Sequence, residues 1–99
     1  MRVLITRPAD KDLEDIFDFI ARDNVPAAIE YVRELRAKAL GLGDFPRMYR
    51  LRRDLPTGNL RTAPAGSHLI VYRVTRSRVE VLRFAHGAMD LIRMFGGTL

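Results

Sequence analysis

Apolar residues recur at helical spacing in two consecutive segments of the first half of the chain. In the first segment, residues 9 to about 22, the apolar positions are Leu13, Ile16, Phe17 and Ile20. In the second segment, residues 26 to about 40, and the turn after it, they are Ala28, Val32, Leu35, Ala39 and Leu42. Both patterns are typical of amphipathic helices. The break between them contains Asn24, a good N-cap, and Pro26, which is tolerated at a helix start. We therefore predict an antiparallel helical hairpin.

The remaining segments are of β type. Residues 2–6 form a short β-rich run, and three more runs follow at residues 60–63 (ended by Pro64), 68–74 and 78–85. In the last run, Arg78, Glu80, Leu82 and Phe84 alternate with Val79, Val81, Arg83 and Ala85. Two short turns between three such runs predict an antiparallel meander, and the first strand is expected to join the same sheet.

The order β-α-α-β-β-β predicts one α+β domain over residues 1–99. In it, an N-terminal strand and a helical hairpin precede a C-terminal three-stranded meander. The hairpin packs on a mainly antiparallel sheet. The residues after the meander are available for a short C-terminal helix.

The amino-acid composition excludes several kinds of functional site. The 99 residues include no cysteine, which excludes disulfides, thiolate metal sites and cysteine nucleophiles. The two histidines, His68 and His86, have no carboxylate at ligand spacing, so no metal and no cofactor is expected. No apolar run approaches the ~20 residues of a membrane span. We expect a cytoplasmic protein without a membrane partner.

Charge is distributed unevenly along the chain, whose formal net charge is +5. Residues 8–44 carry five bases and nine acids, for −4, whereas residues 45–83 carry nine arginines and two acids, for +7. Guanidinium groups suit bidentate contacts with phosphates or carboxylates. The charge thus favours a nucleic acid or an acidic protein segment as partner.

Three arginines fall on three consecutive predicted strands, where they could converge on one sheet face. They are Arg61, Arg73 and Arg83. A metal-independent ribonuclease needs a base, an acid and cations for the phosphorane, and His86 with Arg61 and Arg83 would supply such groups. A structural histidine closing the last strand is the alternative for His86.

Three stretches of the sequence resemble one known family. The first is Ala9-x-x-Asp12-Leu13-x-x-Ile16-x-x-Phe19-Ile20-Ala21 with Asn24-x-Pro26-x-Ala28, and the second is Phe45-Pro46 followed by Leu60-Arg61. The third is Leu69-Ile70-Val71-Tyr72-Arg73-Val74 with Val79-x-Val81-Leu82-Arg83-Phe84-x-His86-Gly87-x-x-Asp90. In this order they resemble the RelE/ParE superfamily of bacterial type II toxin–antitoxin toxins, and the ParE branch in particular.

The resemblance implies a toxin that a small, acidic, ParD-like antitoxin holds inactive in a hetero-oligomer. In the ParE branch the implied target is DNA gyrase, the implied role is plasmid stabilization, and no catalytic residue is expected. The alternative is a RelE-like, ribosome-dependent mRNA endoribonuclease that uses Arg61, Arg83 and His86. The absence of a tyrosine after His86, and of lysines in the central loop, favours the ParE branch. Met89 stands where the ParE pattern commonly has an arginine.

These considerations assign two sets of partner-binding residues. The set expected to bind the antitoxin is Phe19, Ile29, Tyr31, Arg52, Arg61, Arg73 and Arg83. The set expected to bind the target is Arg50, Arg53, His86 and Asp90. Phe19, Ile29 and Tyr31, the aliphatic and aromatic members of the first set, are expected to be exposed on the hairpin, outside the apolar stripes that face the core. We expect no sequence-specific DNA binding by the toxin alone, although a basic nucleic-acid-binding module is the third hypothesis.

Overall fold

Seven helices and strands follow one another in the computed structural model of the chain, which describes residues 1–96. They are β1 (Arg2–Ile5), α1 (Arg7–Ala21), α2 (Val25–Gly41), β2 (Arg61–Ala65), β3 (His68–Val74), β4 (Arg78–Ala85) and α3 (Gly87–Phe95). The predicted α+β order is confirmed, and so is the short C-terminal helix. No helix within the described residues has the length and apolar character needed to cross a membrane.

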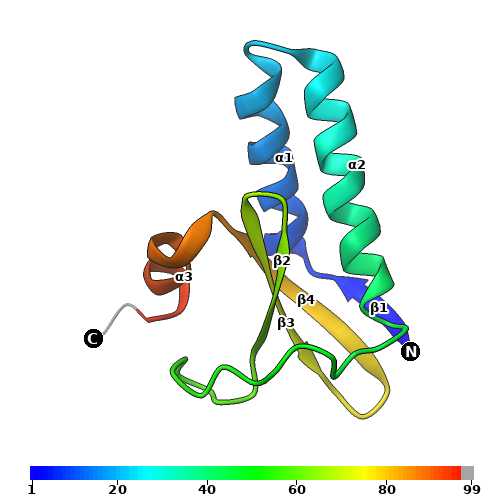
Figure 1. Ribbon diagram of the computed structural model, residues 1–99, viewed down its shortest axis with the longest axis vertical. Helices are drawn as coiled ribbons and strands as arrows, with labels where there is room; N and C mark the ends of the chain where they lie inside the picture. The colour runs from blue at the N-terminus through cyan, green and yellow to red at the C-terminus, as the bar shows by residue number, and fades with distance from the viewer. Residues whose placement is uncertain (97–99) are drawn as a thin grey trace.

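The four strands form one sheet in the order β1-β4-β3-β2 (Figure 1). The predicted meander is confirmed, because β2 pairs antiparallel with β3 and β3 antiparallel with β4. The N-terminal strand joins this sheet as predicted, with β1 parallel to β4 and Arg2 opposite Arg78. The sheet is therefore mainly antiparallel, with one parallel edge strand.

Side-chain caps set the start of both long helices. The Asn24 side chain accepts a hydrogen bond from the Ala27 N–H at 3.0 Å, as its position predicts for an N-cap. The Thr6 hydroxyl caps α1 and also donates to the Val81 carbonyl of β4 at 2.9 Å. Helix α1 thus begins at Arg7, earlier than the predicted residue 9, because Thr6 fastens the strand end and the helix start at one point.

Two details of the sheet differ from the predictions. The strand β2 continues through Pro64 to Ala65, which an edge strand tolerates because its outer N–H groups need no partner. The prediction that side chains alternate strictly between the two faces along the whole of β4 was wrong. A β-bulge places Tyr72 opposite Val81 but Val71 opposite Arg83, so one residue of β4 is extra.

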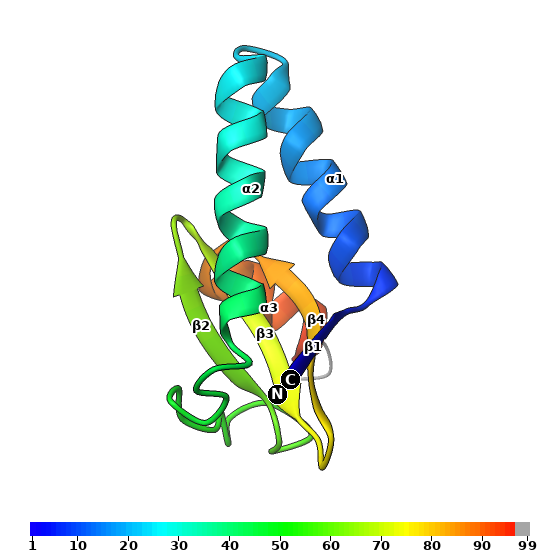
Figure 2. The same cartoon turned by 90° about the vertical axis from the view of Figure 1, so that its right-hand side faces the viewer.

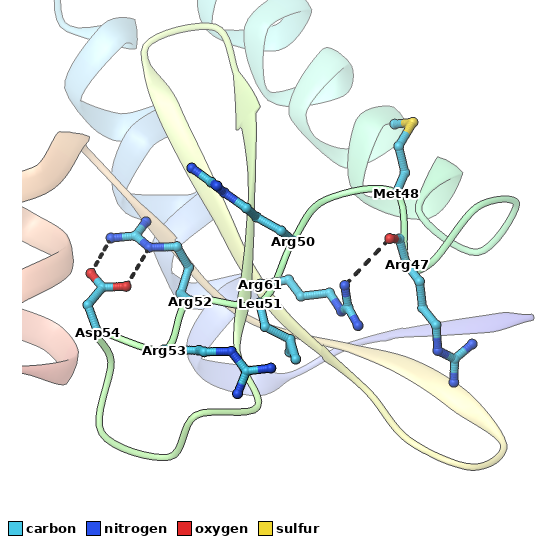
Figure 3. Close-up of a pocket in the computed structure, with 8 residues that line it drawn as sticks. All are labelled: Arg47, Met48, Arg50, Leu51, Arg52, Arg53, Asp54 and Arg61. Atoms are coloured by element: carbon cyan, nitrogen blue, oxygen red, sulfur yellow. Dashed lines mark hydrogen bonds and ion pairs between the residues drawn. The ribbon is translucent and has the colours of Figure 1, made fainter.

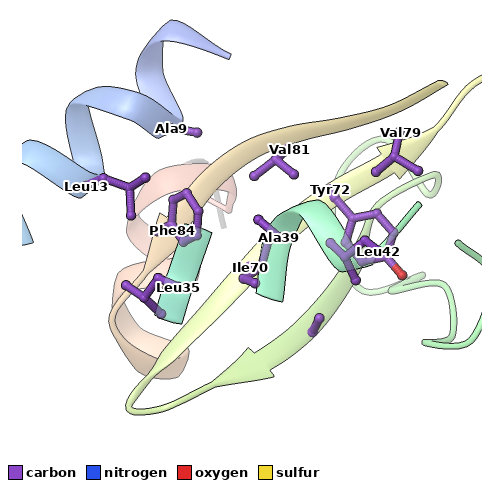
Figure 4. Packing of buried hydrophobic residues seen from close by; sticks show 11 residues of the cluster. Ala9, Leu13, Leu35, Ala39, Leu42, Ile70, Tyr72, Val79, Val81 and Phe84 are labelled. Atoms are coloured by element: carbon purple, nitrogen blue, oxygen red, sulfur yellow. The ribbon is translucent and has the colours of Figure 1, made fainter. Parts of the chain in front are cut away.

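Hydrophobic clusters lie on both faces of the sheet. On one face, both long helices pack on β3 and β4, and Figure 4 shows this cluster around Leu13, Leu35, Tyr72 and Phe84. Because of the bulge, Phe84 joins Val79 and Val81 in this cluster, and the predicted alternation had separated them. The second cluster comprises Leu55, Leu60, Val71, Ala85 and Leu91, and the partly buried Phe95 of α3 packs against it.

The helical hairpin extends well beyond the sheet. Figures 1 and 2 show the turn between α1 and α2 at one end of the molecule and the loop of residues 42–60 at the other. Only the half of the hairpin that lies away from the α1–α2 turn packs on the strands. Its outer part therefore presents side chains that the domain's own core does not cover.

Candidate functional site

Exposed apolar side chains mark the outer part of the hairpin. Phe19 of α1 is 68% exposed, and Val25 and Ile29 of α2 are 50% and 44% exposed. The predicted exposure of Phe19 and Ile29 is confirmed. Clustered exposed apolar residues of this kind mark surfaces that bind other proteins.

Two adjoining hollows run along α2. The first, of about 520 Å³, is lined by Pro26, Ile29, Glu30, Arg33 and Glu34. The second, of about 240 Å³, is lined by Tyr31, Glu34, Leu35, Lys38, Pro64, Ala65 and Gly66. They share Glu34, and together they follow α2 from the hairpin end to the β2–β3 turn. We call this pair of hollows with Phe19 the hairpin surface; its length suits an extended or helical segment of another chain.

Tyr31 is not the freely exposed residue that the sequence predicted. It is half-buried against the core, and its hydroxyl lies 2.7 Å from Nδ1 of His68 and accepts from the Ser67 N–H at 3.1 Å. The His68 ring in turn lies 4.9 Å from that of His86. Burial, together with the charge of His86, lowers the pKa of His68 below its ordinary value. Tyr31 thus anchors α2 to the sheet and contributes only part of its ring to the hairpin surface.

Five arginines surround one open hollow of about 600 Å³ at the other end of the molecule (Figure 3). We call it the arginine hollow; its lining residues are Arg47, Met48, Arg50, Leu51, Arg52, Arg53, Asp54 and Arg61. Asp54 is the single acid of this lining. The Arg52 guanidinium holds it through two contacts, of 2.9 and 2.7 Å, and lowers the pKa of the Asp54 carboxyl.

The prediction that Arg61, Arg73 and Arg83 converge on one sheet face was wrong. Arg61 lies opposite Tyr72, and Arg73 follows Tyr72 in the same strand, so these two arginines occupy opposite faces. Each has its own partner. Nη1 of Arg61 donates to the Tyr49 carbonyl at 2.6 Å, whereas Nε of Arg73 donates to Glu80 at 2.7 Å.

Arg83 is engaged by Asp12, an acid of α1 to which the sequence analysis assigned no contact. The Asp12 carboxylate accepts from Nε of Arg83 at 2.8 Å and from the Phe84 N–H at 2.9 Å. An aspartate on the core-facing side of α1, next to Leu13 in the sequence, was the available signal, because buried carboxylates are almost always paired. Arg83 therefore ties two elements together, and little of its guanidinium is left for a partner.

The residues named for a ribonuclease are not brought together. Arg61 lies opposite Tyr72, whereas His86 follows Ala85, which lies opposite Leu69. Three residues along β3 separate these points by about 10 Å. His86 is exposed, and its N–H donates to Asp90 at 2.8 Å, so both residues stabilise the start of α3. Within residues 1–96, no three histidines or acids are grouped in a way that would hold a metal ion.

The chain is similar over nearly its whole length to known proteins. The family model described as "ParE toxin of type II toxin-antitoxin system, parDE" matches residues 3–91. Toxin ParE1 of Caulobacter vibrioides is 37% identical over 87% of this chain and 88% of its own. Toxin ParE1 of Mycobacterium tuberculosis is 35% identical over 93% and 95%, respectively.

A solved structure shares the fold. It is a chain of the chromosomal ParDE TA system from P. aeruginosa, which matches 89% of this chain and 97% of its own with a TM-score of 0.77 at 21% identity. The family match and the two relatives extend over the helical hairpin, the sheet and the loop between them. The chain belongs to the ParE toxin family of type II toxin–antitoxin systems.

Proposed function

We propose that this protein is the toxin of a pair and that a ParD-like antitoxin neutralises it by docking on the hairpin surface. The observation that carries the proposal is the exposure of Ile29 in the first hollow along α2, together with the exposed Phe19 on α1 of the same hairpin. Apolar side chains at the centre of an interface supply most of its binding energy when they are buried there. The partner of the related ParDE system supports a ParD-like antitoxin as the occupant.

The second part of the proposal is that the released toxin inhibits DNA gyrase in the bacterial cytoplasm. Membership of the ParE family supports this target. Arg50 and Arg53, in the arginine hollow, and His86 with Asp90, at the start of α3, are the proposed contacts. They lie on two separate segments, so the target would meet a broad surface rather than one pocket.

Antitoxin docking is tested with one exposed apolar residue from each helix of the hairpin. Ile29→Asp, and likewise Phe19→Asp, is expected to weaken antitoxin binding about tenfold or more, because a charge replaces a buried apolar contact. Leu40→Asp is the matched control. Leu40 is 51% exposed on the same helix but lies outside the hairpin surface. Isothermal titration with the purified ParD-like antitoxin measures all three variants. Equal losses in Ile29→Asp and Leu40→Asp would contradict the docking site.

The target is tested separately. Purified toxin in large excess is expected to stop ATP-dependent supercoiling of relaxed plasmid by gyrase, and added antitoxin is expected to restore it. Normal supercoiling at every toxin concentration would refute the gyrase part and leave antitoxin docking standing. Cleavage of mRNA on translating ribosomes, with supercoiling unaffected, would assign the protein to the RelE-type alternative.

A further inference from the structure

The arginine hollow concentrates positive charge that the domain itself does not neutralise. Its lining has five arginines against one aspartate, and Asp54 is already paired with Arg52. Arg47, Arg50 and Arg53 make no ion pair with any residue of the described part of the chain. Like charges held around one concavity raise the local potential and attract an anion.

Backbone and side-chain contacts hold the hollow in shape. Leu51 forms a β-bridge with Arg61, and the Arg52 N–H donates to the Leu60 carbonyl at 2.7 Å. The Arg61 guanidinium is fixed by the Tyr49 carbonyl, and Nη1 of Arg52 also donates to the Thr62 hydroxyl at 3.2 Å. The loop of residues 47–54 is thus fastened along the start of β2. Its arginines project from a supported frame, and each keeps donors for a ligand.

The lining decides which class of anion fits. An acidic peptide needs apolar anchor points as well as cations, and only Met48 and Leu51 are apolar here. Single-stranded nucleic acid binds on aromatic side chains that stack with bases, and the lining has none. Guanidinium groups without such partners suit phosphate oxygens, which a duplex presents in a continuous row. We propose that the arginine hollow binds the phosphodiester backbone of duplex nucleic acid, independently of sequence.

The position of the hollow makes this binding separable from antitoxin docking. Figures 1 and 2 place the loop of residues 42–60 and the hairpin turn at opposite ends of the molecule. A segment seated near Phe19 and Ile29 would leave the arginine hollow open. The inference goes beyond the proposed function, since it concerns the toxin alone and requires neither gyrase nor antitoxin.

The test measures binding of the free, full-length protein to labelled duplexes of about 20 base pairs by fluorescence anisotropy between about 50 and 200 mM salt. A DNA duplex and an RNA duplex of equal length form two arms that identify the source of the backbone. Arg50→Gln/Arg53→Gln is expected to lose about tenfold or more in affinity and to lower the slope of log K against log salt by about 2. Both side chains are exposed and unpaired in the described structure, so the fold is expected to persist.

The matched control is Arg7→Gln/Arg22→Gln, which removes the same charge from two exposed positions, the first residue of α1 and the residue that follows its last. It is expected to change the affinity less than about threefold. Equal losses in both double variants would overturn the proposal, because net charge alone would then explain binding. Absence of binding to either duplex at about 50 mM salt would also overturn it. Equal affinity for polyglutamate of the same charge would assign the hollow to acidic protein segments instead.

Discussion

Asp12 and Arg83, which are 71 residues apart in the chain, form the contact that closes the open edge of β4. The strand β1 ends opposite Val81, so the following N–H groups of β4 have no strand beside them. The Asp12 carboxylate takes the place of that strand by accepting from the Phe84 N–H, and it binds the Arg83 guanidinium at 2.8 and 2.9 Å. One side chain of α1 thus continues the sheet edge and holds the helix on it.

Asp12→Asn is expected to destabilise the protein by about 2–3 kcal/mol, because it removes the buried carboxylate that both the partly buried Arg83 and the Phe84 N–H use as acceptor. Urea denaturation measures the change. Asp15→Asn is the control, since Asp15 pairs with Lys11 on the solvent side of α1 with both side chains more than half exposed. Its loss is expected to stay under about 0.5 kcal/mol. A loss in Asp12→Asn as small as that of the control would contradict the role of Asp12 as the edge contact.

Glu80 is expected to make stability depend on pH in the acid range. Hydrogen bonds from Arg73 and Arg78 lower the pKa of its carboxyl below the ordinary value of 4.5. The unfolded chain therefore binds a proton first as pH falls. The contribution of Glu80 is complete above its ordinary pKa and is lost as pH drops through the folded pKa.

Urea midpoints measured across the acid range test this dependence. Glu80→Gln is expected to be less stable than the wild type near neutral pH. Its urea midpoint is also expected to fall less than that of the wild type as the pH is lowered through the acid range. Glu14→Gln, on the exposed side of α1, is expected to keep the wild-type slope. If the urea midpoint of Glu80→Gln fell with pH as steeply as that of the wild type, other carboxylates would be responsible for the pH dependence.

His68 is expected to resist protonation in the folded protein. Its half-buried ring lies beside His86, and burial and that neighbour lower its pKa below 6.5. Because unfolded His68 takes a proton more readily than folded His68, the free energy of unfolding falls as pH drops through about 6.5. An NMR titration is expected to place the His68 midpoint below 6.5, and His86→Asn is expected to raise it. A wild-type midpoint at or above 6.5 would be inconsistent with this arrangement.

Two glycines at the end of α2 are expected to respond oppositely to alanine. A Cβ at Gly43 would clash with the Met1 carbonyl oxygen, and the Met1 ammonium donates to the Gly43 carbonyl at 3.0 Å. Gly43→Ala is therefore expected to cost about 1–3 kcal/mol. Gly41→Ala meets nothing within 4 Å and ends a helix, so it is expected to be neutral or to stabilise by up to about 1 kcal/mol. Thermal unfolding of both variants checks the pair, and equal effects would contradict the close approach at Gly43.

The elements of this fold follow from patterns that lie within single segments. Apolar spacing along α1 and α2, the Asn24 cap and the turn residues between the β runs are local signals, and each predicted an element that the structure contains. Segment charges likewise predicted a basic loop-and-sheet half. The exposure of Phe19 and Ile29 followed from their positions off the helical seams.

Only the tertiary structure decided which distant side chains meet. The bulge in β4 moved Phe84 onto the helix side, and pairing register placed Arg61 and Arg73 on opposite faces. Asp12 can contact Arg83 because β1 ends opposite Val81 and leaves the following residues of β4 without a neighbouring strand on that side. A local period carries no information on where a partner strand ends or slips by one residue, and a slip of one residue reverses the face that a side chain occupies. The arrangement of the arginines, and thus the hollow at the start of β2, depended on that register.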